Sequence, residues 1–186
     1  KMITKKSVLV TGGAGGMGLA TAFKLSQNGF HVFVADTNMA MIKNIELNDA
    51  ITPLLMDVTD RKSIERAFNE VKSQTDSLAG IVNFAGILRV GSISEMPEEM
   101  LSQLLDINVM GTYRVNQIFL PLLNTDSKGR IINVSSETGW QSGGPFNGAY
   151  AMSKHAIEAY SDSLRRELMF LGISVIKLQP GPFKTN

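Results

Sequence analysis

Six short apolar runs alternate along the chain with five longer amphipathic segments. The short runs, rich in Val, Ile, Leu and Phe, cover 7–11, 31–35, 52–56, 79–84, 130–135 and 174–178. The longer segments, which we expect to be helices, cover 17–28, 38–47, 62–73, 98–123 and 149–171. Nearly continuous apolar runs are typical of parallel strands that are buried on both faces. Parallel strands joined by helical crossovers of one hand form an open, doubly wound sheet. The pattern therefore predicts a single α/β domain over residues 1–186.

Charge and composition exclude several classes of protein. The chain has 18 Lys and Arg against 17 Asp and Glu, a net charge of +1, so no overall field would attract nucleic acid or an anionic membrane. The lack of cysteine excludes disulfides, thiolate catalysis and cysteine-ligated metals, and with only His31 and His155 we expect no metal site. The longest uncharged stretch, 7–23, contains five glycines and makes a poor membrane span. We expect a soluble, cytoplasmic protein.

A glycine-rich loop connects the first expected strand to the first expected helix. Its sequence is Thr11-Gly12-Gly13-Ala14-Gly15-Gly16-Met17-Gly18. Glycines let backbone N–H groups approach a pyrophosphate, and the helix N-terminus adds a positive dipole. Two registers fit, one starting at Gly13 and one at Gly12, and a tight turn without a ligand is the structural alternative. Because the loop follows a first strand and opens a helix, it favours a dinucleotide site in a Rossmann-like fold.

Asp36 follows the second expected strand, 20 residues after Gly16. An acidic residue at this position binds the adenosine ribose hydroxyls of NAD and repels the 2′-phosphate of NADP. Neither Gly15 nor Thr37 offers a guanidinium group for that phosphate. The position therefore favours NAD, and a solvated loop carboxylate or helix cap is the alternative interpretation.

Tyr150 and Lys154 lie four residues apart at the start of the fifth expected helix, so their side chains share one face. Ser135 and Ser136 end the strand before it. A phenol can exchange a proton with an alcohol or carbonyl oxygen if its pKa falls toward the working pH, and a nearby ammonium favours the phenolate. A serine hydroxyl can orient the substrate oxygen. The constellation indicates redox chemistry between an alcohol and a carbonyl.

With these residues the chain resembles the main, non-extended branch of the short-chain dehydrogenase/reductase family. The glycine loop matches that family's coenzyme loop in the Gly12, Gly16, Gly18 register. Ser136, Tyr150 and Lys154 fall on its catalytic positions. Other similar segments are Asp57-Val58, Asn83-Phe84-Ala85-Gly86, Asn108 with Gly111, and Pro180-Gly181-Pro182-Phe183-Lys184-Thr185. The resemblance extends over almost the whole chain and implies a Rossmann-like sheet.

The resemblance implies a role for each matched residue. Tyr150 would be the acid/base, Lys154 would hold the nicotinamide ribose and lower the pKa of Tyr150, and Ser136 would position the substrate oxygen. Asn108 would anchor a water relay to Lys154 through its backbone, at a local distortion of its helix. Besides Tyr150 and Lys154, the NAD-binding residues would be Gly12, Gly15, Gly16, Met17, Gly18, Asp36, Asp57, Val58, Asn83, Ala85, Gly86, Pro180, Gly181, Phe183 and Thr185.

The chain departs from the family's pattern at two places. Phe84 stands where the family has a second asparagine, which removes an amide that braces the central strand. The loop 137–149 is one residue longer than usual, which leaves Ser135, and more remotely Ser142, as alternatives to Ser136. Trp140 in this loop is either a wall of the substrate pocket or a loop anchor.

Helices 98–123 and 149–171 carry more apolar positions than one sheet face needs. In the family these helices pair across a twofold axis, so we expect a homodimer or homotetramer, with packing against further C-terminal chain as the alternative. Family members continue past the sixth strand with a substrate-binding loop, another helix and a seventh strand. We therefore expect that the 186 residues lack the segment that would identify the substrate.

The expected function is NAD-dependent interconversion of a secondary alcohol and a ketone or aldehyde on a small-molecule substrate. Segment 159–185 resembles the family's hydroxysteroid, retinol and 3-hydroxybutyrate dehydrogenases. Two other functions stay open. One is a nucleotide-sugar epimerase or dehydratase of the family's extended branch, which shares the Tyr-x-x-x-Lys spacing. The other is a non-catalytic protein that senses dinucleotides.

Overall fold

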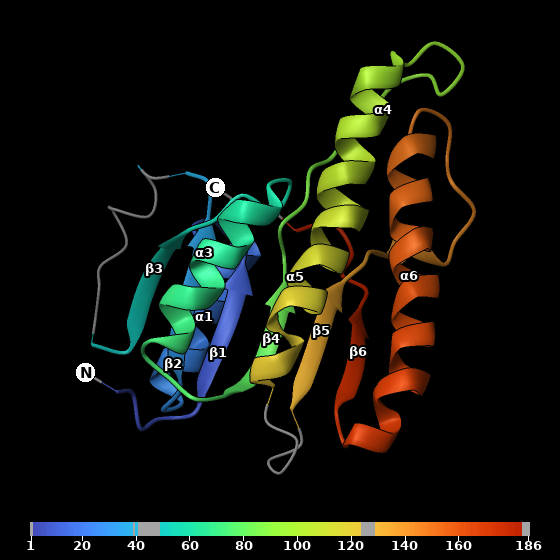
Figure 1. Ribbon diagram of the computed structural model, residues 1–186. Helices are drawn as coiled ribbons and strands as arrows, with labels where there is room; N and C mark the ends of the chain where they lie inside the picture. Colours follow the sequence, from blue (N-terminus) through green and yellow to red (C-terminus); the bar gives the residue numbers. More distant parts are fainter. Residues whose placement is uncertain (1, 39, 41–48, 124–128, 184–186) are drawn as a thin grey trace.

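Six parallel strands form one sheet in the order β3-β2-β1-β4-β5-β6 (Figure 1). The computed structural model describes residues 2–38, 40, 49–123 and 129–183. The strands are β1 Ser7–Thr11, β2 His31–Asp36, β3 Ile51–Leu55, β4 Leu78–Asn83, β5 Arg130–Val134 and β6 Ser174–Leu178. The chain winds outward in one direction from β1 and in the other from β4, which confirms the predicted doubly wound Rossmann-like fold.

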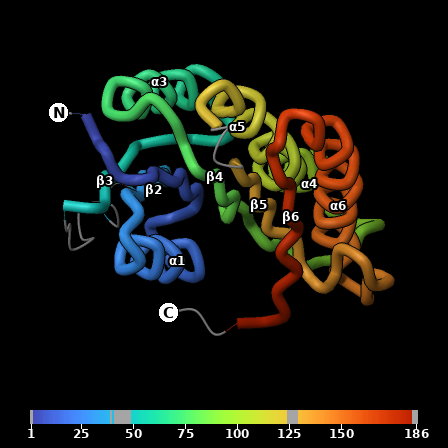
Figure 2. Tube along the Cα trace, turned by 90° about the horizontal axis from the view of Figure 1, so that it is seen from below, coloured from blue at the N-terminus to red at the C-terminus, as the bar shows by residue number. Residues whose placement is uncertain are grey.

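The sheet is covered on both faces. Helix α1, Gly16–Gln27, lies on one face, whereas α3, Arg61–Lys72, α5, Thr112–Phe119, and α6, Gly148–Leu168, lie on the other (Figure 2). Alternate strand residues point to opposite faces. Val8, Val10, Val32 and Val34 therefore pack with the α1 side chains, and Leu9, Phe33, Ile81 and Ile131 with the other layer. The apolar runs of the sequence reflect this burial on both faces.

Most element ends lie within a residue of their predicted positions. Asp60 caps α3, since its carboxylate accepts a hydrogen bond of 2.9 Å from the Lys62 N–H. Helix α6 ends at Leu168 and is followed by a 3₁₀ turn, Met169–Leu171, whereas one continuous helix to 171 was expected. The helix expected over 38–47 falls almost entirely outside the described residues. No helix in the described parts of the chain is long and apolar enough to cross a membrane.

The helix expected over 98–123 is not continuous. It consists of α4, Glu98–Leu105, a π-helical segment, Asp106–Gly111, then α5 and a 3₁₀ turn, Leu120–Leu122. Long-range contacts hold the π segment. The Asn108 side chain pairs with the Ile87 backbone, and a side chain at Gly111 would come within 2.7 Å of Val58 Cγ2. Such distortions depend on tertiary contacts, which helix periodicity does not reveal.

Candidate active site

Two adjoining clefts open at the carboxyl ends of the strands. The first, of about 740 Å³, lies between the loops that follow β1, β2, β3 and β4 and the residues of α4 and the π segment. The second, of about 650 Å³, is lined by the loops after β4, β5 and β6 and by the start of α6. Gly86 and Ile87 belong to both clefts. Ligands of doubly wound sheets bind at this edge, where the strand order reverses.

The glycine loop after β1 closes one end of the first cleft. Gly12 has φ +61°, and a Cβ there would lie 2.7 Å from the Ala85 backbone nitrogen. A side chain at Gly18 would collide with the Gly12 carbonyl oxygen. Gly15, which precedes α1, offers no side-chain cap, so the first N–H groups of the helix are left for another acceptor. A backbone cradle of this kind fits the pyrophosphate of a dinucleotide.

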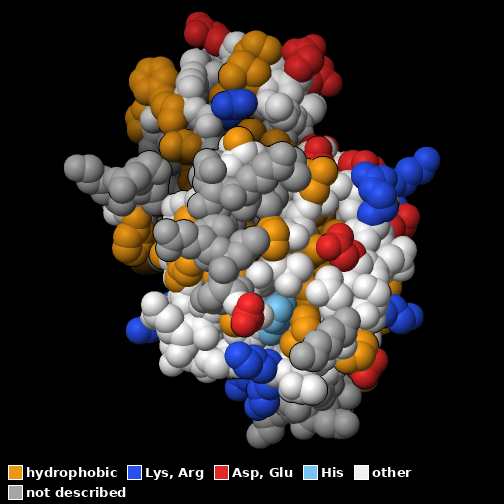
Figure 3. Space-filling model, turned by 90° about the vertical axis from the view of Figure 1, so that its left-hand side faces the viewer, with side chains coloured by type: hydrophobic (Ala, Val, Ile, Leu, Met, Phe, Trp, Pro, Cys, Tyr) orange, Lys and Arg blue, Asp and Glu red, His pale blue; other side chains and the backbone are white. Residues whose placement is uncertain are grey.

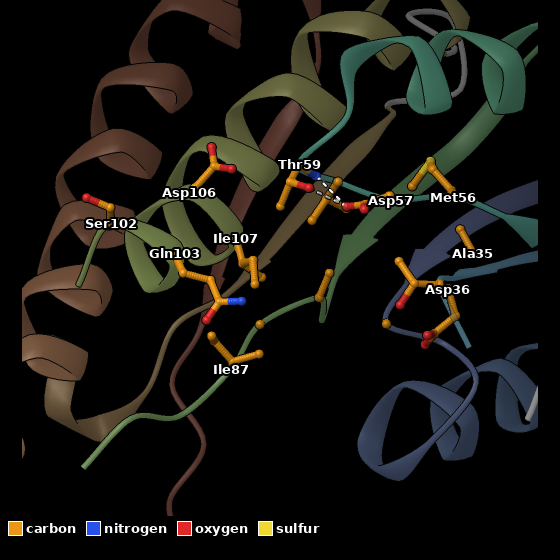
Figure 4. A pocket seen from close by; sticks show the side chains of 15 residues that line it. Ala35, Asp36, Met56, Asp57, Thr59, Ile87, Ser102, Gln103, Asp106 and Ile107 are labelled. Carbon is orange, nitrogen blue, oxygen red and sulfur yellow. Dashed lines mark hydrogen bonds between the residues drawn. The ribbon is translucent and has the colours of Figure 1, made fainter. Parts of the chain in front are cut away.

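Asp36 lies on the wall of the first cleft, beside Ala35 (Figure 4). Its carboxylate accepts hydrogen bonds from the N–H groups of Ala14, at 3.2 Å, and Asn38, at 3.0 Å. The side chain therefore ties the glycine loop to the end of β2 while facing the cleft. Asp36 thus makes local hydrogen bonds and also faces the cleft, and its ribose-binding role stays a prediction.

Asp57 and Val58 form the far wall of the first cleft, after β3. One Asp57 carboxylate oxygen accepts hydrogen bonds from the Thr59 N–H, at 2.8 Å, and hydroxyl, at 2.7 Å (Figure 4). The opposite wall consists of side chains that the sequence did not single out, namely Ser102, Gln103, Asp106 and Ile107. They come from α4 and the π segment, and no local motif identifies them.

Ser136, Tyr150 and Lys154 meet in the second cleft. The Ser136 hydroxyl lies close enough to the Tyr150 phenol to lower the pKa of that phenol. The Lys154 ammonium donates to the Val134 carbonyl oxygen at 2.9 Å and lies 5.4 Å from the centre of the Tyr150 ring. Because the lysine is buried, it is held in this one position.

The structure distinguishes the three candidate serines. Ser136 and Ser135 both line the cleft, and the Ser136 hydroxyl oxygen accepts a hydrogen bond of 3.3 Å from the Thr138 N–H. The Ser135 hydroxyl donates to the backbone carbonyl oxygen of Lys154 at 3.4 Å instead. Ser142 lies in an exposed loop. The geometry therefore favours Ser136 as the partner of Tyr150, despite the longer loop.

Burial shifts the pKa values of the tyrosine and the lysine in opposite directions. It raises the pKa of Tyr150 above its ordinary value, and the Ser136 hydroxyl opposes this shift in part. Burial also lowers the pKa of Lys154 to about 8. The pKa of Tyr150 is therefore raised overall, because desolvation of the phenolate is the larger effect, and the lowering of this pKa by Lys154 stays a prediction.

Asn108 holds the loop after β4 against the π segment. Its amide oxygen accepts from the Ile87 N–H at 2.8 Å, and its amide nitrogen donates to the Ile87 carbonyl oxygen at 2.9 Å and to Ser153 Oγ at 3.1 Å. The helix distortion that the resemblance implied at this residue is present. Asn108 thereby connects the wall shared by both clefts to helix α6.

Asn83 points into the core, although the resemblance placed it among the coenzyme contacts. Its amide nitrogen donates to the side-chain oxygens of Asn116, at 2.8 Å, and Asn133, at 2.9 Å. Asn133 in turn donates to Ser161 Oγ at 2.9 Å. Sequence reasoning missed this buried network, which joins β4, β5, α5 and α6. Its only local signal is polar residues inside apolar elements.

The other predicted residues fall into three groups. Those that line the clefts or the hollow beside the glycine loop are Gly15, Gly16, Met17, Gly18, Ala85, Gly86, Pro180, Gly181 and Phe183. Thr185 and Lys184 lie outside the described residues. Trp140 is 65% exposed and is not among the residues that line the second cleft.

Comparisons with known proteins agree with this geometry. Residues 6–186 match the family model described as short chain dehydrogenase. The chain is 37% identical to the uncharacterized oxidoreductase YbbO of Escherichia coli, covering 99% of this chain and 68% of that protein. It is 41% identical to a 3-amino-tetrahydro-pyrrolizinone reductase of Xenorhabdus hominickii, covering 98% of this chain and 63% of that protein. A solved short-chain dehydrogenase from Streptomyces avermitilis superimposes with a TM-score of 0.92 at 30% identity, covering 99% of this chain and 68% of the other. The chain belongs to the short-chain dehydrogenase/reductase family of oxidoreductases.

Proposed function

We propose that this chain carries the catalytic centre of an NAD-dependent oxidoreductase that interconverts a secondary alcohol and a ketone or aldehyde. The observation that carries the proposal is that Ser136, Tyr150 and Lys154 line one cleft, with the buried Lys154 ammonium 5.4 Å from the centre of the phenol ring. This group lies in a cleft that continues, through Gly86 and Ile87, into a second cleft with the features of a dinucleotide site.

The first cleft and the glycine loop would hold the adenosine and pyrophosphate parts of the coenzyme. The N-terminus of α1 supplies N–H donors, and Asp36 supplies acceptors for ribose hydroxyls. A negative carboxylate at this wall disfavours an added phosphate, which supports NAD over NADP. When bound, the coenzyme supplies a nicotinamide ring that accepts or donates a hydride.

The residues of the second cleft would transfer the proton that is lost or gained by the substrate oxygen when the hydride moves. In the oxidation direction Tyr150, as phenolate, takes the hydroxyl proton of the alcohol, and in reduction it returns that proton to the carbonyl oxygen. Ser136 orients the same oxygen through its hydroxyl, and the Lys154 ammonium favours the phenolate electrostatically. We propose that the Asn108 backbone, in the π segment, anchors the route by which that proton exchanges with solvent.

The rim of the second cleft favours an apolar substrate. Leu88, Val90 and Phe183 line the cleft and are each more than half exposed. Hydrophobic side chains also gather at the upper end of the molecule in Figure 3, where Figure 1 places the loops after β4 and β5. Apolar walls around a few convergent polar groups are typical of sites for small apolar ligands.

We propose an oligomer formed through α5 and α6. A shallow groove of about 260 Å³ lies between these helices on the side away from the sheet. Tyr113, Leu120, Tyr160 and Leu164 contribute to its walls. Size-exclusion chromatography with light scattering on the full-length protein tests this, and a strictly monomeric protein would contradict it.

A turnover screen with NAD tests the proposed activity. The full-length protein would be assayed for NADH production with steroids, retinoids, polyols and hydroxy acids. We expect measurable oxidation of at least one apolar secondary alcohol and little activity with NADP. Tight NAD binding without hydride transfer to any alcohol or ketone would indicate a dinucleotide sensor, and turnover of nucleotide sugars alone would indicate an epimerase or dehydratase.

A further inference from the structure

A buried carboxylate lies one helical turn after Lys154, outside the residues so far given a role. Glu158 on α6 is 9% exposed and faces the ends of β5 and β6. Burying a charged carboxylate costs free energy unless it is paired and hydrogen-bonded. The residues that pair with the Glu158 carboxylate therefore indicate its structural role.

Three side chains from two strand ends converge on this carboxylate. Gln179 donates its amide N–H to Glu158 at 2.9 Å, and the Lys177 ammonium lies 2.9 Å from the other oxygen. The Ser135 hydroxyl, which donates to the Lys154 carbonyl oxygen, lies close enough to contribute to the low pKa of this carboxylate. Burial alone would raise the pKa of Glu158, but these partners outweigh it and hold that pKa below its ordinary value, so the group is charged at neutral pH.

Two of these partners, Ser135 and Gln179, are adjacent in sequence to residues that line the catalytic cleft. Ser135 precedes Ser136, and Gln179 precedes the Pro180–Phe183 segment, which lines the same cleft as Tyr150. The backbones of these two loops are joined in the same region, because the Ser135 N–H donates to the Leu178 carbonyl oxygen at 2.8 Å. The Glu137 N–H likewise donates to the Pro180 carbonyl oxygen at 3.2 Å.

The short turn after Ser136 is also fitted to this cluster. A Cβ at Gly139 would collide with Ser135 Oγ and would lie 3.2 Å from both Glu158 Cγ and the Lys154 carbonyl oxygen. The turn Glu137–Gly139 therefore rests directly on α6 beside Glu158. The end of β5 with the turn after it, the segment after β6, and α6 thus meet at one carboxylate.

We propose that Glu158 is a positioning residue, whose charged carboxylate fixes Ser136 and the Pro180–Phe183 segment relative to Tyr150 and Lys154 on α6. The inference rests on the proposed function, since it assigns Glu158 to the same reaction. A displacement of about 1 Å in such a site can cost about 100-fold in rate, so loss of this contact should lower kcat rather than abolish the coenzyme site.

The test compares three variants of the full-length protein. Glu158→Ala removes the carboxylate, Glu158→Gln keeps its shape and an acceptor oxygen, and Asp162→Asn is the matched control. Asp162 is the other carboxylate on Lys177, at 2.9 Å, but it is more exposed and lies one turn further from Lys154. Turnover is expressed per NADH-binding site, which removes any effect of a smaller folded fraction.

We expect Glu158→Ala to lower kcat per site at least about tenfold, with a smaller change in KM. Glu158→Gln should recover part of this loss. The kcat of Asp162→Asn should stay within about twofold of the wild-type value. Hydrogen exchange supplies a readout that does not need turnover. Peptides covering 134–141 and 176–183 should exchange faster in Glu158→Ala than in Asp162→Asn.

The outcomes separate this inference from the proposed function. If the wild-type protein oxidises an alcohol while Glu158→Ala has unchanged kcat and unchanged exchange, the positioning role is refuted and the activity stands. If no substrate is turned over, the activity fails and the exchange data alone decide whether Glu158 fixes the two loops. Equal losses in Glu158→Ala and Asp162→Asn would also overturn the inference, because they would reflect the Lys177 ion pairs in general.

Discussion

The coenzyme preference provides a prediction that depends on one charge. Replacing Asp36 by Asn keeps a side chain of the same shape and an oxygen that can still accept from Ala14 or Asn38, but removes the negative charge from the cleft wall. We expect Asp36→Asn to bind NADP more tightly than the wild type while binding NAD slightly less tightly. Adding Thr37→Arg to an Asp36→Ala variant should shift the preference further toward NADP.

The size of the effect follows from Coulomb's law. Two unit charges about 4 Å apart repel by about 1 kcal/mol in water and by about 4 kcal/mol at the effective dielectric constant of about 20 found near protein surfaces. Asp36 is only partly buried, so the repulsion of a 2′-phosphate should lie between these values. This range corresponds to about 5-fold to about 1,000-fold in the ratio of the NADP and NAD dissociation constants.

Titration of NADH and NADPH by fluorescence measures the two dissociation constants directly. The measurement should be repeated at high salt, because screening shrinks a charge effect and leaves a hydrogen-bond effect almost unchanged. An unchanged NADP to NAD ratio in Asp36→Asn would refute the role of the charge. A loss of affinity for both coenzymes alike would show that Asp36 acts only by holding the glycine loop.

Two further predictions concern the glycine loop and the buried lysine. Gly12→Ala should abolish NADH binding and destabilise the protein by about 1–3 kcal/mol in urea unfolding, because its φ is +61° and a Cβ would lie 2.7 Å from the Ala85 nitrogen. Gly29→Ala is the control, because Gly29 also has a positive φ, +85°, but its Cβ would meet nothing within 4 Å, so this variant should keep NADH binding. Equal NADH affinity in the two variants would contradict the role of the glycine loop in binding the pyrophosphate. Burial lowers the pKa of Lys154 from 10.5 to about 8, so the unfolded chain binds more protons than the folded one between these values and stability rises with pH there. Lys154→Met should therefore unfold at a higher urea concentration than the wild type at pH 7. This gain in stability should shrink as the pH rises through the range between the two pKa values. A gain in stability that does not depend on pH would show that burial of the charged ammonium is not its cause.

Much of the fold could be predicted from local pattern. Strands buried on both faces leave nearly continuous apolar runs, and Asp60 marks the start of α3 because it satisfies an N–H that the helix cannot. Tyr150 and Lys154 were found in the same way, since residues four apart share a helix face. These features can be predicted because each depends only on residues that are close to one another in the sequence.

The features that local sequence pattern does not predict depend on distant residues. The π segment is held by Asn108 and its contacts with the Ile87 backbone, and nothing within 98–123 encodes that pairing. Asn83 turns inward because Asn116 and Asn133 offer acceptors from other elements. The raised pKa of Tyr150 comes from burial, which spacing does not report.

The position of Glu158 on the same helix face as Tyr150 and Lys154 could have been predicted from the sequence. It follows Lys154 by four residues, as Lys154 follows Tyr150, so all three share one face of α6. A charged residue on a helix face that must pack against the sheet requires partners. Its partners, Ser135, Lys177 and Gln179, could not be named before the strand order was known.

The central claim is that Tyr150 exchanges a proton with the substrate while contributing little to coenzyme binding. Tyr150→Phe removes the phenol oxygen but keeps the ring beside Lys154. The decisive measurement is kcat for NAD-linked alcohol oxidation together with the NADH dissociation constant, in the same preparation of the full-length variant. The account predicts that kcat falls by about 100-fold to 10,000-fold while NADH affinity changes by less than about threefold. Turnover close to that of the wild type, or loss of NADH binding in step with activity, would contradict it.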